Sequence, residues 1–504
     1  MHVGVDFGDI WMRAARVSGP QGQPCAIPDL REPRELATRL CVQVDAEGAL
    51  VGDIAAELQR EHPTTTVVSD LRSRLINEAA LLPEATGREW FAEGLAGLCL
   101  RKLRRDVAGL GIGDWNSTTL TVPANASSLL RERLQSAARL ADLSHVCLLE
   151  EPIAAWCFVN ASSPARGLPL VLQVDELSST VTLIDGNESR PRVLISYSLP
   201  RTGGSQAEQF VVEQLERDLD PATARAFDSG TSIRDELHRE LCRERMERVS
   251  PSIAVARRAW LHQGTVSEVL LRRSLWEQAW SPIRETLMTL IRQTVQQAGV
   301  ALRDVRQVIL VGAAVSECEI EREVTSLFPQ ATLWHRPELA AWLPAYGASL
   351  VGPSHPAWKI EESSVVSSEP IPADVGILIL NPVTRQPDLD VLLPKGTQPP
   401  DRATRHYQPQ PGQSMFTVEL VQRQIQSPGY RSLSRWEIPL AAGTTRPSVQ
   451  VTCELLDDRH LEVTLGGDLA PSAELRRRIS LDDPSTTGRE ASQRTLLETT
   501  SWRD

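Results

Sequence analysis

Short apolar runs alternate with longer helical patterns over roughly the first 350 residues, and this alternation constrains the fold more than any other feature. Four of the runs are rich in β-branched residues and predict buried strands, at Met1–Val5, Thr118–Val122, Leu168–Val174 and Val305–Val311. Strands separated by helical segments are typical of parallel sheets that helices cover. The sequence therefore predicts an α/β fold for this part of the chain.

Two segments between these strands carry a helical pattern. One runs from about Ser128 to Leu140, where Ser127 or Ser128 supplies a hydroxyl that can cap the helix. In the other, apolar residues from Trp276 to Val295 recur every three or four positions. This spacing predicts one long amphipathic helix, or two with a restart at Pro282.

Two of the predicted strands end in an acidic residue followed by a turn. The first reads Val3-Gly-Val-Asp6 and the second reads Leu172-Gln-Val-Asp175, about 170 residues later. Such an echo suggests a duplicated lobe in which each half directs one carboxylate into a shared cleft. A strand that ends in an acid is common in α/β proteins, so both acids also fit a plain role as solvated strand ends.

The composition changes after residue 353. Residues 354–374 are rich in Ser, Glu and Pro and predict a linker between a domain at 1–353 and another at 375–468. The second domain shows only short strand patterns, as in an antiparallel sandwich, and residues 469–504 predict a flexible tail. The predicted strands are Val375–Leu380, Leu389–Leu393, Phe416–Gln422, Arg435–Ile438, Val449–Leu455 and Leu461–Leu465.

Charge and hydropathy exclude several classes of protein. A formal net charge of −12 argues against a nucleic-acid surface, which needs clustered Lys and Arg. The start of the chain lacks the pattern of a signal peptide, and no apolar run approaches the ~18 residues that cross a bilayer. Eight scattered cysteines without a CxxC pair fit buried thiols in a reducing compartment. We therefore expect a cytoplasmic protein that binds neither nucleic acid nor membrane.

Several motifs occur in the order of one known family. Leu120-Thr-Val-Pro-Ala, a helix, and then Leu148-Leu-Glu-Glu-Pro-Ile-Ala-Ala resemble the strand–helix–strand segment of DnaK-type heat-shock chaperones. Val308-Ile-Leu-Val-Gly-Ala-Ala, Ala345-Tyr-Gly-Ala and Leu50-Val-Gly-Asp-Ile-Ala-Ala resemble further segments of that family, and Leu392-Leu-Pro-Lys-Gly resembles its client-binding region. Each motif alone is weak, but their order and spacing are specific.

The resemblance implies an α/β, actin-like nucleotide-binding domain with two lobes, followed by an antiparallel β-sandwich that grips apolar polypeptide. It implies ATP or ADP with Mg²⁺ as the cofactor. Unfolded or partner polypeptides and co-chaperones are the implied partners. In that family two carboxylates hold the hydrated Mg²⁺ ion while glycine-rich turns cradle the phosphates.

The family's functional positions map onto this sequence as follows. Asp6 and Asp175 match the metal-binding acids, and Glu151, Asp175 and Thr180 match the catalytic group. Glu151 also fits a plain loop acid, and Thr180 also fits a packing role in a β-rich run. Tyr407, Phe416 and Val418, which match peptide-binding positions, fit a sandwich core equally well. The other matched positions are Gly8, Ser178, Ser179, Gly203, Gly204, Arg257, Arg258, Gly312 and Ala313 at the nucleotide, Pro123 and Arg131 in the allosteric relay, and Tyr407, Phe416 and Val418 in peptide binding.

Several phosphate-contacting positions depart from the family pattern. The first turn, expected as D-L-G-T-T, reads Asp6-Phe-Gly-Asp9-Ile10, which puts an acid beside the phosphate position. The second, expected as D-L-G-G-G-T, has Leu177, Ser178 and Ser179 where glycines let backbone amides approach phosphate. The catalytic lysine falls at Ser73, next to Arg72. These changes predict very slow or absent ATP hydrolysis.

The family closes a helical lid over its peptide groove, which needs a long helix after the sandwich. Pro471, Pro484 and the polar run from Ser485 to Glu490 argue against such a helix within residues 469–504, so we expect a divergent, lidless member. Three hypotheses follow: a chaperone-like nucleotide- and polypeptide-binding protein, a non-enzymatic pseudo-ATPase scaffold, and a sugar or acetate kinase on the same fold. The β-rich region and the Glu-Glu-Pro segment argue against the kinase.

Overall fold

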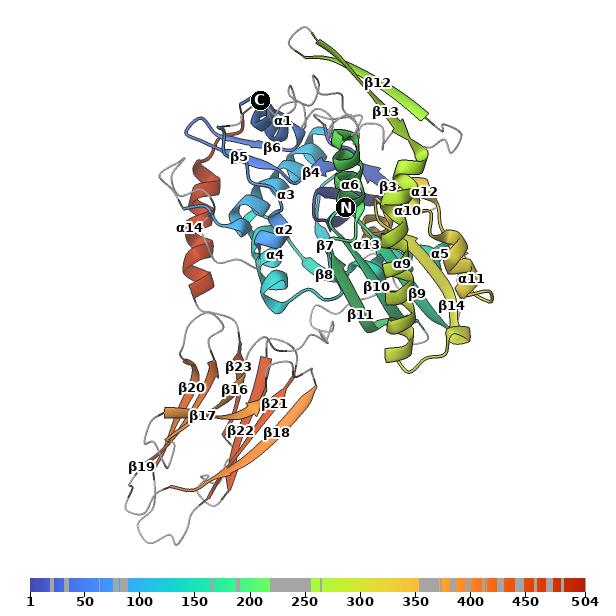
Figure 1. Ribbon diagram of the computed structural model, residues 1–504. Coiled ribbons are helices and arrows are strands. Elements are labelled where there is room, and N and C mark those ends of the chain that lie inside the picture. The colour runs from blue at the N-terminus through green and yellow to red at the C-terminus, as the bar shows by residue number, and fades with distance from the viewer. Residues whose placement is uncertain are drawn as a thin grey trace. The chain divides into compact units, whose positions relative to one another are not determined.

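The computed structural model divides the chain into two compact units (Figure 1). The N-terminal unit comprises Met1–Asn125, Leu134–Lys359 and Gln493–Asp504, and the C-terminal unit comprises Ala126–Arg133 and Ile360–Ser492. Of the predicted linker at 354–374, only Ile371 and Asp374 are among the described residues. The described residues are 1–18, 22–30, 36–62, 64–75, 81, 89–164, 167–186, 191–217, 255–262, 265–352, 371, 374–380, 387–394, 397, 400–409, 413, 415–423, 430–439, 448–456, 460–467, 475–481 and 485–503.

The first sheet of the N-terminal unit has the strand order β3-β2-β1-β7-β8, with β4 paired to β2. Strand β1 is antiparallel to β2 and parallel to β7, and β7 is parallel to β8. Every residue of β7 and all but the first of β1 are buried, as expected for the β-branched runs that form them. The strands are β1 (His2–Phe7), β2 (Trp11–Ser18), β3 (Gln23–Ile27), β4 (Thr38–Arg39), β7 (Ser117–Val122) and β8 (Val146–Glu150).

The second sheet repeats this plan with the order β11-β10-β9-β14-β15. Strand β9 is antiparallel to β10 and parallel to β14, and β14 is parallel to β15. Strands β1 and β9 thus hold the same place in their sheets, and Asp6 and Asp175 lie at their carboxyl ends, as the sequence echo suggests. The strands are β9 (Leu168–Val174), β10 (Ser178–Asp185), β11 (Arg192–Pro200), β14 (Val305–Val311) and β15 (Thr332–Trp334).

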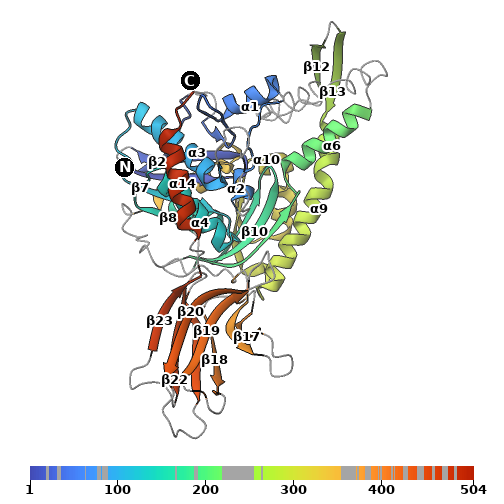
Figure 2. The same ribbon diagram turned by 90° about the vertical axis from the view of Figure 1, so that its left-hand side faces the viewer.

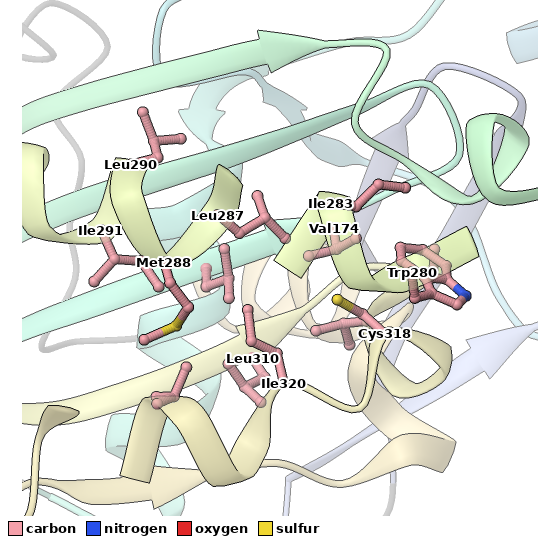
Figure 3. Packing of buried hydrophobic residues seen from close by; sticks show 14 of the residues in the cluster. Val174, Trp280, Ile283, Leu287, Met288, Leu290, Ile291, Leu310, Cys318 and Ile320 are labelled. Carbon is pink, nitrogen blue, oxygen red and sulfur yellow. The ribbon is translucent and has the colours of Figure 1, made fainter. Parts of the chain in front are cut away.

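Helix α9 (Arg273–Gln297) packs its apolar side on the second sheet. It is one continuous helix with Pro282 inside it, so the long-helix alternative is the correct one. Trp280, Ile283 and Leu287 lie over Val174 and Leu310 of β9 and β14 in Figure 3. Burial of these side chains, each worth about 1.5–3 kcal/mol, holds the helix on the sheet.

Helices α5 (Glu151–Ser162) and α13 (Leu343–Leu350) pack against each other and contact strands of both sheets. They approach so closely that a Cβ atom on Gly347 would lie 1.6 Å from the carbonyl oxygen of Ala154. A Cβ on Gly4 of β1 would likewise lie 2.2 Å from the backbone nitrogen of Ser349. This tight junction fixes Glu151, the first residue of α5.

The remaining elements of the N-terminal unit surround this framework. No described helix has both the length and the apolar content needed to cross a membrane. The seven cysteines in the described part of the chain are free thiols. The elements are β5 (Val42–Val44), β6 (Ala49–Val51), α1 (Asp53–Glu61), α2 (Leu71–Arg74), α3 (Ala92–Gly109), α4 (Ser128–Leu140), which continues from the C-terminal unit, α6 (Gly204–Arg217), β12 (Val255–His262), β13 (Thr265–Arg272), a 3₁₀ turn (Leu302–Asp304), α10 (Val315–Cys318), α11 (Glu321–Leu327) and α12 (Pro337–Ala340).

The C-terminal unit contains two four-stranded antiparallel sheets that share one hydrophobic core. Alternate residues of β21 and β22 enter this core, which is the period-two pattern of half-buried strands. The sheets have the orders β17-β16-β19-β20 and β18-β21-β22-β23. Their strands are β16 (Val375–Leu380), β17 (Pro387–Leu393), β18 (Asp401–Tyr407), β19 (Met415–Arg423), β20 (Tyr430–Pro439), β21 (Val449–Leu455), β22 (His460–Gly467) and β23 (Leu475–Ser480).

The prediction of a flexible tail over 469–504 is wrong for two segments. Strand β23 pairs with β22 along its whole length, and residues Ser485–Thr499 form helix α14. The polar composition hides both elements, because β23 reads Leu-Arg-Arg-Arg-Ile-Ser and α14 buries only a narrow stripe that includes Gln493 and Leu497. The polarity of a segment is therefore a poor guide to its disorder here.

Candidate functional site

A cluster of charged side chains lies where the two duplicated sheets meet the start of α5. Asp6 comes from β1, Asp9 from the turn after it, Arg72 from α2, Glu151 from α5 and Asp175 from the end of β9. All five line the same cavity, whose volume is about 20 Å³. A cavity of this size has room for about one water molecule.

The guanidinium group of Arg72 lies at the centre of this cluster. Its Nε and Nη2 atoms lie 2.7 Å from Oδ1 of Asp9, and Nη1 donates to Oε1 of Glu151 at 2.6 Å. The residue is 9% exposed, so these are largely desolvated charge-assisted hydrogen bonds. One cation thus joins the turn after β1 to the N-terminal end of α5.

Neutral donors complete the cluster. Nε2 of Gln173 donates to Oε2 of Glu151 and to Oδ2 of Asp175, both at 2.6 Å. The hydroxyl of Thr121 donates to Oδ1 of Asp6 at 2.7 Å, and Nη1 of Arg13 lies 4.0 Å from Oδ2 of Asp6. Each buried carboxylate therefore has a partner within the protein, as buried charges require.

Four carboxyl groups share only two guanidinium groups here, and this imbalance appears in the pKa values. Burial raises the pKa of Glu151 to about 8, although Arg72 acts in the opposite direction. Burial also raises the pKa of Asp175 to about 6 and raises that of Asp6. The charges of Glu151 and Asp9 outweigh burial at Arg72 and raise its pKa, so this side chain stays protonated.

Several of the backbone positions predicted at the nucleotide lie close to Asp175. Gly204 donates its N–H to the carbonyl oxygen of Asp175 at 3.0 Å, and a Cβ on Gly203 would lie 2.2 Å from the same oxygen. Gly312 has a φ of +103°, and the N–H of Ala313 donates to Oδ1 of Asp175 at 3.3 Å. Gly8 and Ala313 line the cavity, whereas Gly203, Gly204 and Gly312 lie behind Asp175.

Other predicted residues point elsewhere. Thr180 Oγ1 donates to Ser198 Oγ at 3.2 Å, and Ser179 Oγ donates to the carbonyl oxygen of Thr202, so neither lines the cavity. Ser178 begins β10 and also lies outside the cavity lining. The catalytic and phosphate roles expected for these three residues therefore have no support in the geometry of the cluster.

Four more predicted positions lie away from the cluster or outside the described side chains. Arg257 and Arg258 lie on β12, opposite Leu270 and Val269 of β13, and their side chains are outside the described part. Pro123 directly follows β7, and Arg131 is a buried residue of α4. None of them is among the cavity-lining residues.

The predicted peptide-binding residues lie in the C-terminal unit. Val418 on β19 is 1% exposed and belongs to the shared core of the two sheets. Phe416 and Tyr407 are half-buried and pack against that core, and the hydroxyl of Tyr407 donates to Oδ2 of Asp390 at 2.8 Å. The sequence left open a peptide-binding role or core packing for these residues, and the burial of Val418 favours core packing.

The side chains of the cluster do not fit a Mg²⁺-bound nucleotide. Mg²⁺ binds through carboxylates and several retained waters, but Arg72 already satisfies Asp9 and Glu151, and the cavity has room for only about one water. Among the described residues, no group of three or more His, Cys, Asp or Glu side chains is placed to hold a metal ion.

Two other features of the N-terminal unit lie outside this cluster. A hollow of about 510 Å³ between α9 and α11 shares no lining residue with it. Ser316, His335 and Glu321 form a hydrogen-bonded chain, with distances of 3.2 Å and 2.8 Å. Neither the hollow nor the cavity is lined by these three residues, so we assign the chain a structural role in joining β15 to α10 and α11.

The sequence did not reveal the central role of Arg72 or the bridging role of Gln173. Arg72 stood out only as the neighbour of Ser73, which occupies the position of the family's lysine. The four-residue helix α2 and the left-handed Asp70 before it, with a φ of 54°, set which of the two side chains enters the cluster. Gln173 carried one usable signal, since it lies two residues before Asp175 on the same face of β9.

Comparison with known proteins gives similarity at low identity, and no model of a known protein family matches the chain. A "Chaperone protein HscA homolog" from Methylococcus capsulatus is 26% identical over 492 residues, which cover 92% of this chain and 75% of that protein. The protein of the same name from Pseudomonas aeruginosa is 24% identical over 517 residues, covering 95% and 78%. The one from Bordetella petrii is 26% identical over 373 residues, covering 72% and 57%. The chain is thus similar, over most of its length, to chaperones of the DnaK-type heat-shock family.

Proposed function

We propose that this chain is a chaperone-like polypeptide-binding protein in which an actin-like, two-lobed nucleotide domain has lost effective ATP hydrolysis. Its β-sandwich is the surface that binds unfolded or partner polypeptides, and co-chaperones are further partners. One observation carries the proposal: the buried guanidinium of Arg72 is held between Asp9 and Glu151. It lies among the acids that match the family's metal-binding and catalytic groups.

Electrostatics supports the loss of hydrolysis. Phosphoryl transfer depends on positioned charges that face the phosphates and the attacking water. Here the carboxylates face a fixed internal cation, and Asp9 adds a negative charge at the turn where the family has a hydroxyl. Binding of ATP or ADP would have to break the Arg72 hydrogen bonds, so we expect it to be weak or absent.

The second turn supports the same conclusion. Leu177, Ser178 and Ser179 replace three glycines whose backbone amides would approach phosphate. Ser179 is fully buried and bound to the backbone of Thr202, so its hydroxyl is not directed at a phosphate position. Two of the family's phosphate-binding elements are therefore altered at once.

We expect the sandwich to bind polypeptide with low affinity. Phe416 of β19 and Tyr407 of β18 are partly buried and pack against the core of the two sheets. We propose a lidless groove, from which bound peptide should exchange fast because a lid acts chiefly on the off-rate.

We predict that Phe416→Val tightens binding of an apolar peptide by about tenfold, equivalent to about 1.4 kcal/mol. The reason is that Phe416 takes the centre of the groove that we propose, where a smaller side chain would leave room for the peptide. Anisotropy of a fluorescent peptide on the full chain measures this change. The matched control is Met415→Val, because Met415 neighbours Phe416 on β19 and is 46% exposed.

Three outcomes of this measurement separate the hypotheses. Tighter binding by Phe416→Val but not by Met415→Val supports the peptide groove. Slow dissociation of peptide from the unmodified chain contradicts the open groove. No response to either substitution favours the alternative function, a non-enzymatic scaffold that docks a fixed partner.

A further inference from the structure

The chain returns to the N-terminal unit after it has formed the two-sheet unit. Residues from Ile360 to Ser492 belong to the C-terminal unit, and Gln493–Asp504 belong to the N-terminal unit. The returning segment comprises α14 and residues 500–503, and Figure 2 shows α14 beside α3. We refer to residues 485–503 as the strap.

Gln493 is the main buried contact of the strap. Its side chain is fully buried, its Oε1 accepts the N–H of Phe91 at 3.1 Å, and its Nε2 donates to the carbonyl oxygen of Glu89 at 2.9 Å. Phe91 is the N-cap residue of α3 and gives that helix no side-chain cap. The strap therefore supplies an acceptor at the N-terminus of α3, where helix N–H groups lack partners.

The surface beneath the strap is shaped by glycines. A Cβ on Gly94 of α3 would lie 2.1 Å from Oε1 of Gln493, and a Cβ on Gly97 would lie 3.6 Å from Cδ1 of Leu497. Gly48, with a φ of +145°, would place a Cβ 2.4 Å from the carbonyl oxygen of Ser501. Gly94 lowers the helix propensity of α3 by about 1 kcal/mol, a cost that close packing of Gln493 against it offsets.

Polar contacts hold the rest of the strap. The carbonyl oxygen of Leu497 accepts from Arg101 at 2.9 Å, and Arg494 donates to Asp142 at 3.1 Å. Beyond α14, the N–H of Ala49 donates to the carbonyl oxygen of Ser501 at 2.9 Å, and the N–H of Arg503 donates to the carbonyl oxygen of Ala49 at 3.1 Å. Arg503 also forms an ion pair with Asp45.

We propose that α3 and the β5–β6 hairpin form a docking surface whose occupant is the chain's own strap. The sandwich is then an insertion fastened to the N-terminal unit at both ends, at the linker and at the strap. This inference concerns residues outside the Arg72 cluster, so it stands or falls independently of the proposed function.

The test is a cut in the linker of the full chain. A site-specific protease sequence placed within residues 360–368 is cleaved to completion, and the product is analysed by size-exclusion chromatography. We expect both fragments to elute together at the position of the uncut chain, because the strap still joins them. Elution of the unmodified cut protein as two separate fragments would overturn the proposal.

Three variants locate the contact. Gln493→Ala with Leu497→Ala should separate the fragments after cleavage, whereas Ser492→Ala with Glu498→Ala, at exposed positions of the same helix, should not. Gly94→Ala should also separate them, although alanine favours the α3 helix by about 1 kcal/mol. Fragments that stay together in both the Gln493/Leu497 and Gly94 variants would contradict the strap.

Hydrogen exchange distinguishes a variant that has lost only the strap contacts from one that fails to fold. In the uncut Gln493/Leu497 variant, the amides of Phe91 and Ala49 should exchange at least about tenfold faster, because the strap holds both. Amides of β9 and β14 should keep their protection, since both strands lie inside the second sheet and contribute to its buried core. Unchanged exchange at Phe91 and Ala49 would count against the docking surface.

Discussion

Replacement of Arg72 by alanine should lower the free energy of unfolding of the N-terminal unit by about 3–5 kcal/mol. The substitution leaves Asp9 and Glu151 without their central cation in a site that is largely desolvated. Loss of Arg72 raises the pKa of Glu151 further and favours its neutral form, which reduces this cost, but Asp9 loses both of its close guanidinium contacts. Urea denaturation followed by far-UV circular dichroism measures the loss.

A matched control separates this effect from the loss of any arginine. Arg192 lies 3.7 Å from Asp185, and its side chain is 62% exposed. Exposed ion pairs contribute about 0–1 kcal/mol, so Arg192→Ala should have little effect. Equal losses for the two variants would show that the Arg72 cluster has no special part in stability.

The steady-state rate of ATP hydrolysis should also be strongly reduced. We expect steady-state hydrolysis of ATP to be at least about a hundredfold slower than that of an intact DnaK-type chaperone assayed alongside, because removal of one stabilising donor alone costs about 10²–10³ in rate. By the resemblance to that family, Ser73 stands in place of the lysine, and Leu177, Ser178 and Ser179 stand in place of three phosphate-turn glycines. Phosphate release by the purified full chain measures the rate.

Trace activity from contaminating ATPases needs its own control. Glu151→Gln removes the carboxylate that matches the family's catalytic glutamate while keeping its size. Any residual phosphate release should be the same for this variant and the unmodified chain. A rate close to that of the intact chaperone, and lost in Glu151→Gln, would show that the cluster is a working active site.

Asp6 and Asp175 could be predicted from the sequence because each follows a strand with a clear apolar pattern. The runs before Asp6 and Asp175 are apolar and β-branched, and their repetition places both residues at corresponding strand ends. Burial on both faces gives such strands a strong sequence signal. Glu151 could be predicted for a related reason, since it lies between the end of β8 and Pro152, which is the second residue of α5.

The remaining features depend on tertiary contacts that leave little local signal. Strand β18 reads Asp-Arg-Ala-Thr-Arg-His-Tyr and has no apolar alternation, yet it pairs with all seven residues of β21. Arg72 enters the cluster only because α2 is short and begins after a left-handed residue. Helix α14 forms because Gln493 and Leu497 are buried on α3 rather than through its own propensity.

We propose that the Arg72 cluster keeps nucleotide out of the cavity that it lines. Isothermal titration of ATP into the full chain, with and without Mg²⁺, tests it directly. We expect a Kd for ATP no tighter than about 1 mM, which corresponds to a binding free energy of about −4 kcal/mol. Adding Mg²⁺ should give no gain in affinity. Saturable binding of one ATP per chain that is tighter than this and strengthened by Mg²⁺ would contradict it.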